Sequence, residues 1–149
     1  MTVPITWLLD TNVVSEMMRP RPEPRVSGFL DSIADEGLGL ASVSFWELLN
    51  GIWRLAPGRR RRSLVGRFHD LVDELFEDRI VDWTVADAQA CAKIMEDKRI
   101  RGEPLDDHFP DAFLAASAFT RGLAVVTRNT GEFRNAGVET VDPWMVGPR

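Results

Sequence analysis

The chain alternates between short, mostly apolar runs and longer stretches whose apolar residues recur every three or four positions. The short runs predict buried strands at residues 5–9, 38–41, 80–81, 124–127 and 139–141. The longer stretches predict helices at residues 12–18, 25–35, 43–56, 59–77, 84–100 and 110–121. Because strands alternate with helices, we predict the α/β class, as a three-layer α/β/α sandwich with a mainly parallel central sheet.

Capping and turn-forming residues set several of these boundaries. Gly37 is expected to end the helix before it, and Ser42 is expected to cap the helix over residues 43–56. Pro57 and Gly58 then break that helix before the next one begins.

Length and composition are those of one ordinary globular domain. The 149 residues, 44% of them hydrophobic, predict a single domain over residues 1–149. There is no apolar stretch of about 18 residues and no apolar leader, so we expect a soluble, cytoplasmic protein. The single cysteine, Cys91, excludes an internal disulfide and a cysteine-built zinc site, and we expect it to pack inside a helix. Two histidines, His69 and His108, exclude a multi-histidine metal site.

The charge pattern is uneven. The formal net charge of −5 argues against nucleic-acid binding driven by bulk charge. Sixteen of the basic residues are arginine, and only Lys93 and Lys98 are lysine. Arginine suits bidentate phosphate contacts, but codon bias explains the same imbalance, and both interpretations stay open.

Asp10 directly follows the first apolar run and opens the segment Asp10-Thr11-Asn12. In open α/β sheets, ligands bind at the carboxyl ends of strands. Burying a carboxylate there costs free energy unless a cation lies beside it. Asp10 therefore predicts a cation-binding position.

Glu47 lies inside the predicted helix over residues 43–56. Its neighbours one turn away are Val43 and Gly51, which are not the partners of a solvated glutamate. The small residue at 51 predicts close approach of another element, so Glu47 is expected to point inward, toward the end of the sheet. A partly exposed helical glutamate is the alternative.

Asp111 follows Pro110 at the start of the helix over residues 110–121, where the helix dipole favours an acid. The small, apolar residues over 112–118 predict tight packing, which would draw the first turn into the fold. An ordinary helix-start aspartate is the alternative.

A fourth polar position follows the predicted strand over residues 124–127. There Asn129 can coordinate a metal or orient water through its amide oxygen, and Glu132 can bring a charge to the same place. A plain turn built from Asn, Thr and Gly explains the segment equally well.

These acids share one electrostatic requirement. Two or three ionised carboxylates within ~5 Å of one another cannot all stay charged without a counter-ion. Mg²⁺ or Mn²⁺ supplies that charge with oxygen ligands alone and can activate water for phosphodiester hydrolysis. The pattern therefore predicts a divalent metal and phosphodiester chemistry.

Five segments, in order, carry a resemblance to a known family. They are Leu8-Leu9-Asp10-Thr11-Asn12-Val13-Val14-Ser15-Glu16, residues 42–51, residues 111–118, residues 125–133 and Asp142-Pro143-Trp144. Each is a weak signal alone, but together they resemble the PIN domain, and more narrowly the VapC/FitB toxins of bacterial type II toxin–antitoxin systems. The resemblance runs from residue 7 to residue 144.

The resemblance implies a PIN-like fold and a Mg²⁺- or Mn²⁺-dependent endoribonuclease that acts as a toxin on RNA. It also implies a homodimer, or a larger toxin–antitoxin assembly, kept inactive by an antitoxin protein that inserts a peptide near the acidic site. The metal ligands it implies are Asp10, Asp111 and Glu47. The catalytic residues are then these three acids together with Asn129. The supporting polar groups are Thr11, Asn12, Thr127 and Glu132.

Two departures from the family pattern leave questions open. The family's fourth acid is often Asp where Asn129 stands here, whereas many members share Asn and carry an acid just before the Phe, as Glu132 does. The loop from Gly102 to Asp111 is also about two residues longer than usual. Its charged residues can reach the site or be solvated loop charges, and they are Asp106, Asp107 and His108.

Two surfaces are candidates for partners. The run Arg59-Arg60-Arg61-Arg62 is a candidate contact for RNA phosphates, with a solvated helix face as the alternative. The predicted helix over residues 43–56 has more apolar side chains than its own core needs, so we expect part of its surface to bind antitoxin or a second subunit. These apolar residues are Trp46, Leu49, Ile52 and Trp53.

Two other functions compete with the nuclease. A phosphotransferase could use Asp10 as a covalent nucleophile, but that class needs a second Asp two residues later, where Asn12 stands. A non-catalytic module that binds RNA or protein on a degraded nuclease fold is favoured by Asn129 and opposed by the intact acids Asp10, Glu47 and Asp111.

Overall fold

The structure, a computed structural model, describes residues 3–105 and 109–149. The strands are β1 (Trp7–Leu9), β2 (Leu38–Ala41), β3 (Ile80–Val81), β4 (Ala124–Val126) and β5 (Thr140–Val141). The α-helices are α1 (Thr11–Met17), α2 (Pro24–Ile33), α3 (Ser42–Trp53), α4 (Arg59–Phe76), α5 (Val85–Ile100), α6 (Phe109–Arg121) and α7 (Pro143–Val146). Two short 3-10 helices are η1 (Ala34–Glu36) and η2 (Thr130–Phe133).

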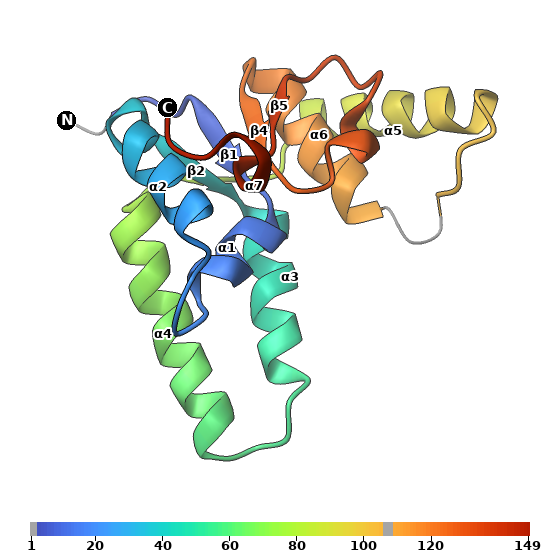
Figure 1. The fold of residues 1–149 in the computed structure, drawn as a ribbon. Coiled ribbons are helices and arrows are strands. Elements are labelled where there is room, and N and C mark those ends of the chain that lie inside the picture. The colour runs from blue at the N-terminus through green and yellow to red at the C-terminus, as the bar shows by residue number, and fades with distance from the viewer. Residues whose placement is uncertain (1–2, 106–108) are drawn as a thin grey trace.

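The five strands form one parallel sheet in the order β3-β2-β1-β4-β5. The central strand β1 pairs with β2 on one side and β4 on the other, so that Leu8 lies opposite both Gly39 and Val125. Figure 1 shows the helices arranged around this sheet, with α3 and α4 forming a hairpin and with α5 packed against α6. The predicted α/β class and the parallel sheet are confirmed.

A hydrophobic core covers each face of the sheet. Consecutive residues of a strand point to opposite faces, so Leu9 and Val126 join the core beneath α1 to α4, while Leu8 and Val125 join the core beneath α5 and α6. All four side chains are fully buried. Because both faces of the sheet are covered, consecutive residues of β1 and β4 are apolar. The sheet and the helices on its two faces are the predicted three layers.

The connections create a crevice at the carboxyl edge of the sheet. The chain leaves β1 to form β2 on one side, and it later returns to form β4 on the other side. Such a reversal of strand order is where open α/β sheets bind ligands. Because α6 leads into the parallel strand β4, its first turn lies at this same edge.

Several predicted boundaries were wrong in detail. The first strand covers residues 7–9 rather than 5–9, because Ile5 and Thr6 precede the paired segment. Ser42 does not cap α3: Ala41 occupies the cap position, and no side chain caps the helix. The pattern gave no sign of α7, which is capped by the Asp142 side chain accepting a hydrogen bond from the Trp144 amide at 2.9 Å.

Two further features agree with expectation. Cys91 is a buried helix residue packed against Met95. None of the helices in the described ranges is long and apolar enough to cross a membrane.

Candidate functional site

Asp10 joins the ends of the two central strands. It follows β1, is only 5% exposed, and caps α1 by accepting a hydrogen bond from the Thr11 amide at 2.7 Å. Its other carboxylate oxygen accepts a hydrogen bond from the hydroxyl of Thr127 at 2.7 Å. Thr127 follows β4 and is fully buried. The carboxylate is therefore fixed at the reversal of strand order.

Asn12 braces the same corner. Its side-chain amide lies 3.4 Å from an Asp10 oxygen and 3.4 Å from the Thr127 hydroxyl. Its carbonyl oxygen accepts the amide of Arg128 at 3.3 Å. Both the nitrogen and the oxygen of the Asn12 side-chain amide are thus hydrogen-bonded, which holds the segment after β4 in place. Asn12 is not an acid, so it cannot act as the second aspartate that a phosphotransferase with Asp10 as nucleophile would need.

Glu47 lies beside Asp10. Helix α3 packs against α1, and the half-buried Glu47 carboxylate has its pKa raised by burial and by the charge of Asp10, although a hydrogen bond with the Thr11 side chain lowers it. The pKa of Asp10 is itself raised by burial, which outweighs the hydrogen bonds from Thr127 and Thr11. Neither carboxylate forms an ion pair with any residue in the described ranges. Two neighbouring acids thus lie together without a protein cation.

Glu47 faces the end of the sheet as predicted, but the predicted close approach of another element at Gly51 is wrong. A Cβ at Gly51 would meet nothing within 4 Å, so no element approaches it closely. Gly51 instead lines a groove of about 350 Å³ between α1, α3 and α4. The glycine keeps that groove open beside Glu47.

The donor chemistry fits a hard divalent cation, because the Asp10 carboxylate lies beside the hydroxyl oxygen of Thr127 and near the Glu47 carboxylate. Asp111 lies half-buried in the first turn of α6, and α6 packs against α3. Across residues 3–105 and 109–149, however, no three Asp, Glu, His or Cys side chains form a group that could hold a metal. Asp10 and Glu47 are a pair, and the ligand role of Asp111 remains a prediction. The loop residues Asp106, Asp107 and His108 lie outside the described residues.

Asn129 and Glu132 are the two candidates for the fourth polar position of the site. Asn129 is exposed, and its backbone amide donates to the Thr127 hydroxyl at 3.0 Å. Glu132 is half-buried in η2, and its carbonyl oxygen accepts a hydrogen bond from the buried Lys98 ammonium at 3.0 Å. The structure therefore holds this loop through backbone atoms, and which side chain completes the site stays open.

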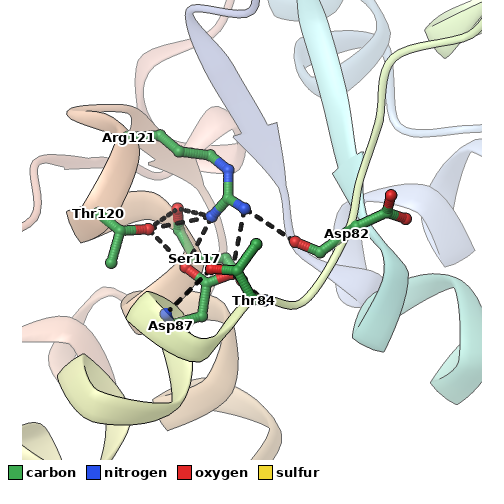
Figure 2. A network of polar contacts seen from close by, with 6 residues as sticks. All are labelled: Asp82, Thr84, Asp87, Ser117, Thr120 and Arg121. Atoms are coloured by element: carbon green, nitrogen blue, oxygen red, sulfur yellow. Dashed lines mark hydrogen bonds and ion pairs between the residues drawn. The ribbon is translucent and has the colours of Figure 1, made fainter.

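Sequence reasoning missed Lys98 and a second buried carboxylate. Asp87, fully buried at the start of α5, accepts hydrogen bonds from Thr120 at 2.5 Å and from Arg121 at 2.8 Å (Figure 2). Arg121 also donates to the carbonyl of Asp82 at 2.8 Å. Burial opposes ionisation of Asp87, but the hydrogen bonds and the Arg121 charge outweigh it and lower the pKa to about 2. This network ties α5 to α6 and has no free coordination capacity.

Part of the apolar surface of α3 is exposed. Trp46 and Trp53 are 58% and 53% exposed, whereas Ile52 is buried in the core. Trp46 lines an apolar hollow with Trp83 and Phe113. The predicted excess of apolar surface on this helix is therefore confirmed for the two tryptophans.

The arginine run lies at the first turn of α4, at the far end of the α3–α4 hairpin from the sheet (Figure 1). Arg59, Arg60 and Arg62 are exposed. Arg61 is half-buried and donates to the carbonyls of Trp53 and Leu55 at 3.4 and 3.3 Å. The run follows the carboxyl end of α3, whereas Glu47, beside Asp10, lies in the middle of that helix.

Comparisons with known proteins agree with this geometry. The sequence matches the family described as "PIN domain" over residues 7–139. It is 35% identical to Toxin FitB of Neisseria gonorrhoeae and 28% identical to VapC ribonuclease Y4jK of Sinorhizobium fredii, in each case over 92% of this chain and at least 96% of the relative. The crystal structure of FitAcB from Neisseria gonorrhoeae superposes with a TM-score of 0.84 at 34% identity, over 95% of this chain and 100% of that one.

Proposed function

Because this chain belongs to the PIN-domain family, we propose that it is a Mg²⁺- or Mn²⁺-dependent endoribonuclease and the toxin of a type II toxin–antitoxin pair. The observation that carries the proposal is the pair Asp10 and Glu47 at the reversal of strand order: both acids have raised pKa values, and neither forms an ion pair within residues 3–105 and 109–149. A site that keeps acids in this state is suited to a bound cation.

The residues have distinct tasks in this proposal. Asp10, Glu47 and Asp111 would hold the ion, and the Thr11 amide and the Thr127 hydroxyl keep the Asp10 carboxylate in one orientation. Bound Mg²⁺ or Mn²⁺ supplies Lewis-acid stabilisation of the phosphate and activation of water. Glu47, which lies beside Asp10, would orient the attacking water or take its proton.

The toxin role rests on the similarity to Toxin FitB and on the surfaces of α3. We propose that the antitoxin peptide occupies the groove beside Glu47, whose apolar lining includes Leu48, Ile52 and Leu64. We propose that the hollow formed by Trp46, Trp83 and Phe113 is the homodimer contact, because it exposes aromatic surface next to the acids. Light scattering of the purified chain tests the dimer: a monomer that Trp46→Ser leaves unchanged would contradict it.

The test of the nuclease is cleavage of a mixed, structured RNA pool by the antitoxin-free chain. We expect discrete products with Mn²⁺ or Mg²⁺, none with EDTA, and none with Asp10→Asn or Asp111→Asn. The control is Asp73→Asn, which makes the same chemical change at an exposed position on α4. Metal-independent products, or full activity in both site variants, would overturn the proposal.

A second candidate function is a module that binds RNA or protein without cleaving it. The exposed Asn129 favours it, because no acid stands at that position. Failure to cleave any RNA in either metal, by folded protein that still binds the same RNAs, would favour this alternative.

A further inference from the structure

The strongest unexplained feature is the charge of the α3–α4 hairpin. Residues 48–69 contain six arginines and no acid. Since the whole chain has 18 basic and 23 acidic residues, the rest of it carries a formal charge of −11. A strongly acidic protein thus concentrates positive charge in one projecting hairpin (Figure 1).

Four of these arginines surround the end of the hairpin, and we call them the arginine tip: Arg54, Arg59, Arg60 and Arg62. All four are exposed, and in the part of the chain that the structure describes none forms a side-chain hydrogen bond or an ion pair. Arg59, Arg60 and Arg62 also crowd the positive end of the α4 dipole, where cations destabilise a helix. The folded chain alone gives no reason for this arrangement.

Arg61 differs from its neighbours because it builds the tip. Its guanidinium binds the carbonyls of Trp53 and Leu55 at the end of α3 and stacks over the Trp53 ring at 4.5 Å. The indole of Trp53 stays 53% exposed. The tip therefore presents an aromatic surface, fixed in place, among unpaired arginines.

The groove beside Glu47 connects the tip with the acids. Its lining begins at Thr11 and Glu47 and continues along α3 to Leu55, next to the tip. At 1.5 Å per helical residue, Arg54 lies roughly 10 Å along the helix axis from Glu47. A chain bound at the tip can thus follow the groove to the acids.

We propose that the arginine tip is a docking surface for single-stranded RNA, which it holds by its phosphates while a base stacks on Trp53. This rests on the proposed nuclease function and adds a binding site remote from the acids. The combination of free guanidiniums with an exposed aromatic ring is that of single-strand binding surfaces. Successive residues of a helical turn point about 100° apart, so the arginines surround the tip and suit a flexible polyanion better than one face of an acidic peptide.

The test measures binding apart from cleavage. A fluorescein-labelled 20-nucleotide RNA is titrated with the full chain in EDTA, and anisotropy is followed from 0.05 to 0.5 M NaCl. The tip variant is Arg59→Gln/Arg60→Gln/Arg62→Gln. Its control, Arg21→Gln/Lys93→Gln/Arg99→Gln, removes the same charge from other exposed positions.

Each phosphate neutralised on a single strand contributes about −0.7 to the slope of log K against log[salt]. Losing three contacts should flatten the slope by about 2, so that affinity near 0.1 M salt falls about 100-fold and the two proteins converge near 1 M. The control should keep the slope of the wild type. Equal slopes for the tip variant and its control would overturn the proposal.

A second variant separates RNA from an acidic protein partner. Trp53→Leu should weaken RNA binding about 10-fold and leave competition by poly-glutamate unchanged. Two results together would assign the tip to an acidic protein instead: poly-glutamate displaces RNA at equal charge concentration, and Trp53→Leu does not change RNA affinity. Wild-type cleavage in Mn²⁺ is measured in parallel. If the wild type does not cleave RNA but the tip variant still has the flatter salt slope, the proposed nuclease function is overturned and the proposed docking surface is kept.

Discussion

Asp10 and Asp87 are both almost fully buried, yet their surroundings differ in kind. The Asp87 carboxylate faces the guanidinium of Arg121 and accepts hydrogen bonds from the Thr120 hydroxyl and the Thr84 amide, which lower its pKa to about 2. Among the described residues, Asp10 receives hydrogen bonds from neutral donors alone; it lies beside a second acid and has a raised pKa. One carboxylate is neutralised by the protein, and the other is not.

The difference separates a structural acid from a functional one. A buried charge is tolerated when it is paired and hydrogen-bonded, as at Asp87 (Figure 2). At Asp10 the fold supplies orientation through the Thr11 amide and the Thr127 hydroxyl, but none of the described residues supplies an opposite charge. A bound cation would provide the missing charge. Replacing Asp10 should therefore affect mainly activity, and breaking the Asp87 pair should affect mainly stability.

Asp10→Asn should have the largest effect, on activity. Asparagine keeps the cap of α1, because its carbonyl can still accept the Thr11 amide, but it removes the charge that holds the ion. Metal stabilisation of a phosphoryl transition state is worth several kcal/mol, so RNA cleavage should fall by about 10³-fold. The urea midpoint should stay the same or rise, because a desolvated charge is lost. A large loss of stability would show that Asp10 is structural.

Breaking the other pair should affect stability instead. Arg121→Met leaves Asp87 buried without its counter-charge and should cost about 3 kcal/mol in urea unfolding. Asp87→Asn/Arg121→Met removes both charges and should recover part of that loss. RNA cleavage per folded molecule should not change in either variant. Lost activity in fully folded protein would mean that the network also positions α6 for catalysis.

Much of the site could be predicted from local sequence. Asp10 and Thr127 each follow a continuously apolar run, so both had to lie at the end of a buried strand. A parallel sheet then places those ends on one edge. The order of the strands in the sheet could not be predicted, and that order is what pairs residues of β1 and β4 that lie 117 positions apart, such as Leu8 and Val125.

The Asp87 network was not predictable, because each of its residues has an ordinary local explanation. Asp87 forms a capping box with Thr84, and Arg121 is a cation in the last turn of α6, where the dipole favours it. The bond between them spans 34 residues and depends on how α5 packs on α6. Lys98 was missed for the same reason: its partner is a backbone carbonyl in η2.

The two acids should also give opposite pH dependence. Asp87 has a folded pKa near 2 against 3.8 for the free group, so its contribution is complete above about pH 4 and is lost as the pH falls toward 2. Its size, reduced for solvent screening, is on the order of 1 to 2 kcal/mol. Asp10 has a raised pKa, so its contribution is present below 3.8 and is lost as the pH rises through the folded value.

The measurement is urea unfolding of the metal-free wild type, Asp10→Asn and Asp87→Asn from pH 2.5 to 7. The stability of Asp10→Asn relative to wild type should increase with rising pH. We expect the free energy of unfolding of the wild type to fall steeply between pH 4 and 2, and we expect this fall to be absent in Asp87→Asn. Parallel pH curves for all three proteins would contradict the assigned pKa shifts.

The smallest effect should come from the two threonines that donate to these acids. Thr120→Val and Thr127→Val make the same isosteric change, and each removes one hydroxyl bond to a buried carboxylate, at 2.5 Å to Asp87 and 2.7 Å to Asp10. Thr120→Val should cost about 1 kcal/mol of stability and leave cleavage unchanged, because Arg121 still neutralises Asp87. Thr127→Val should lower metal affinity and cleavage 10- to 100-fold, as loss of a group that orients a ligand does. Isothermal titration with Mn²⁺ and urea unfolding measure the two effects separately, and equal outcomes for the two variants would remove the distinction between the paired acid and the unpaired one.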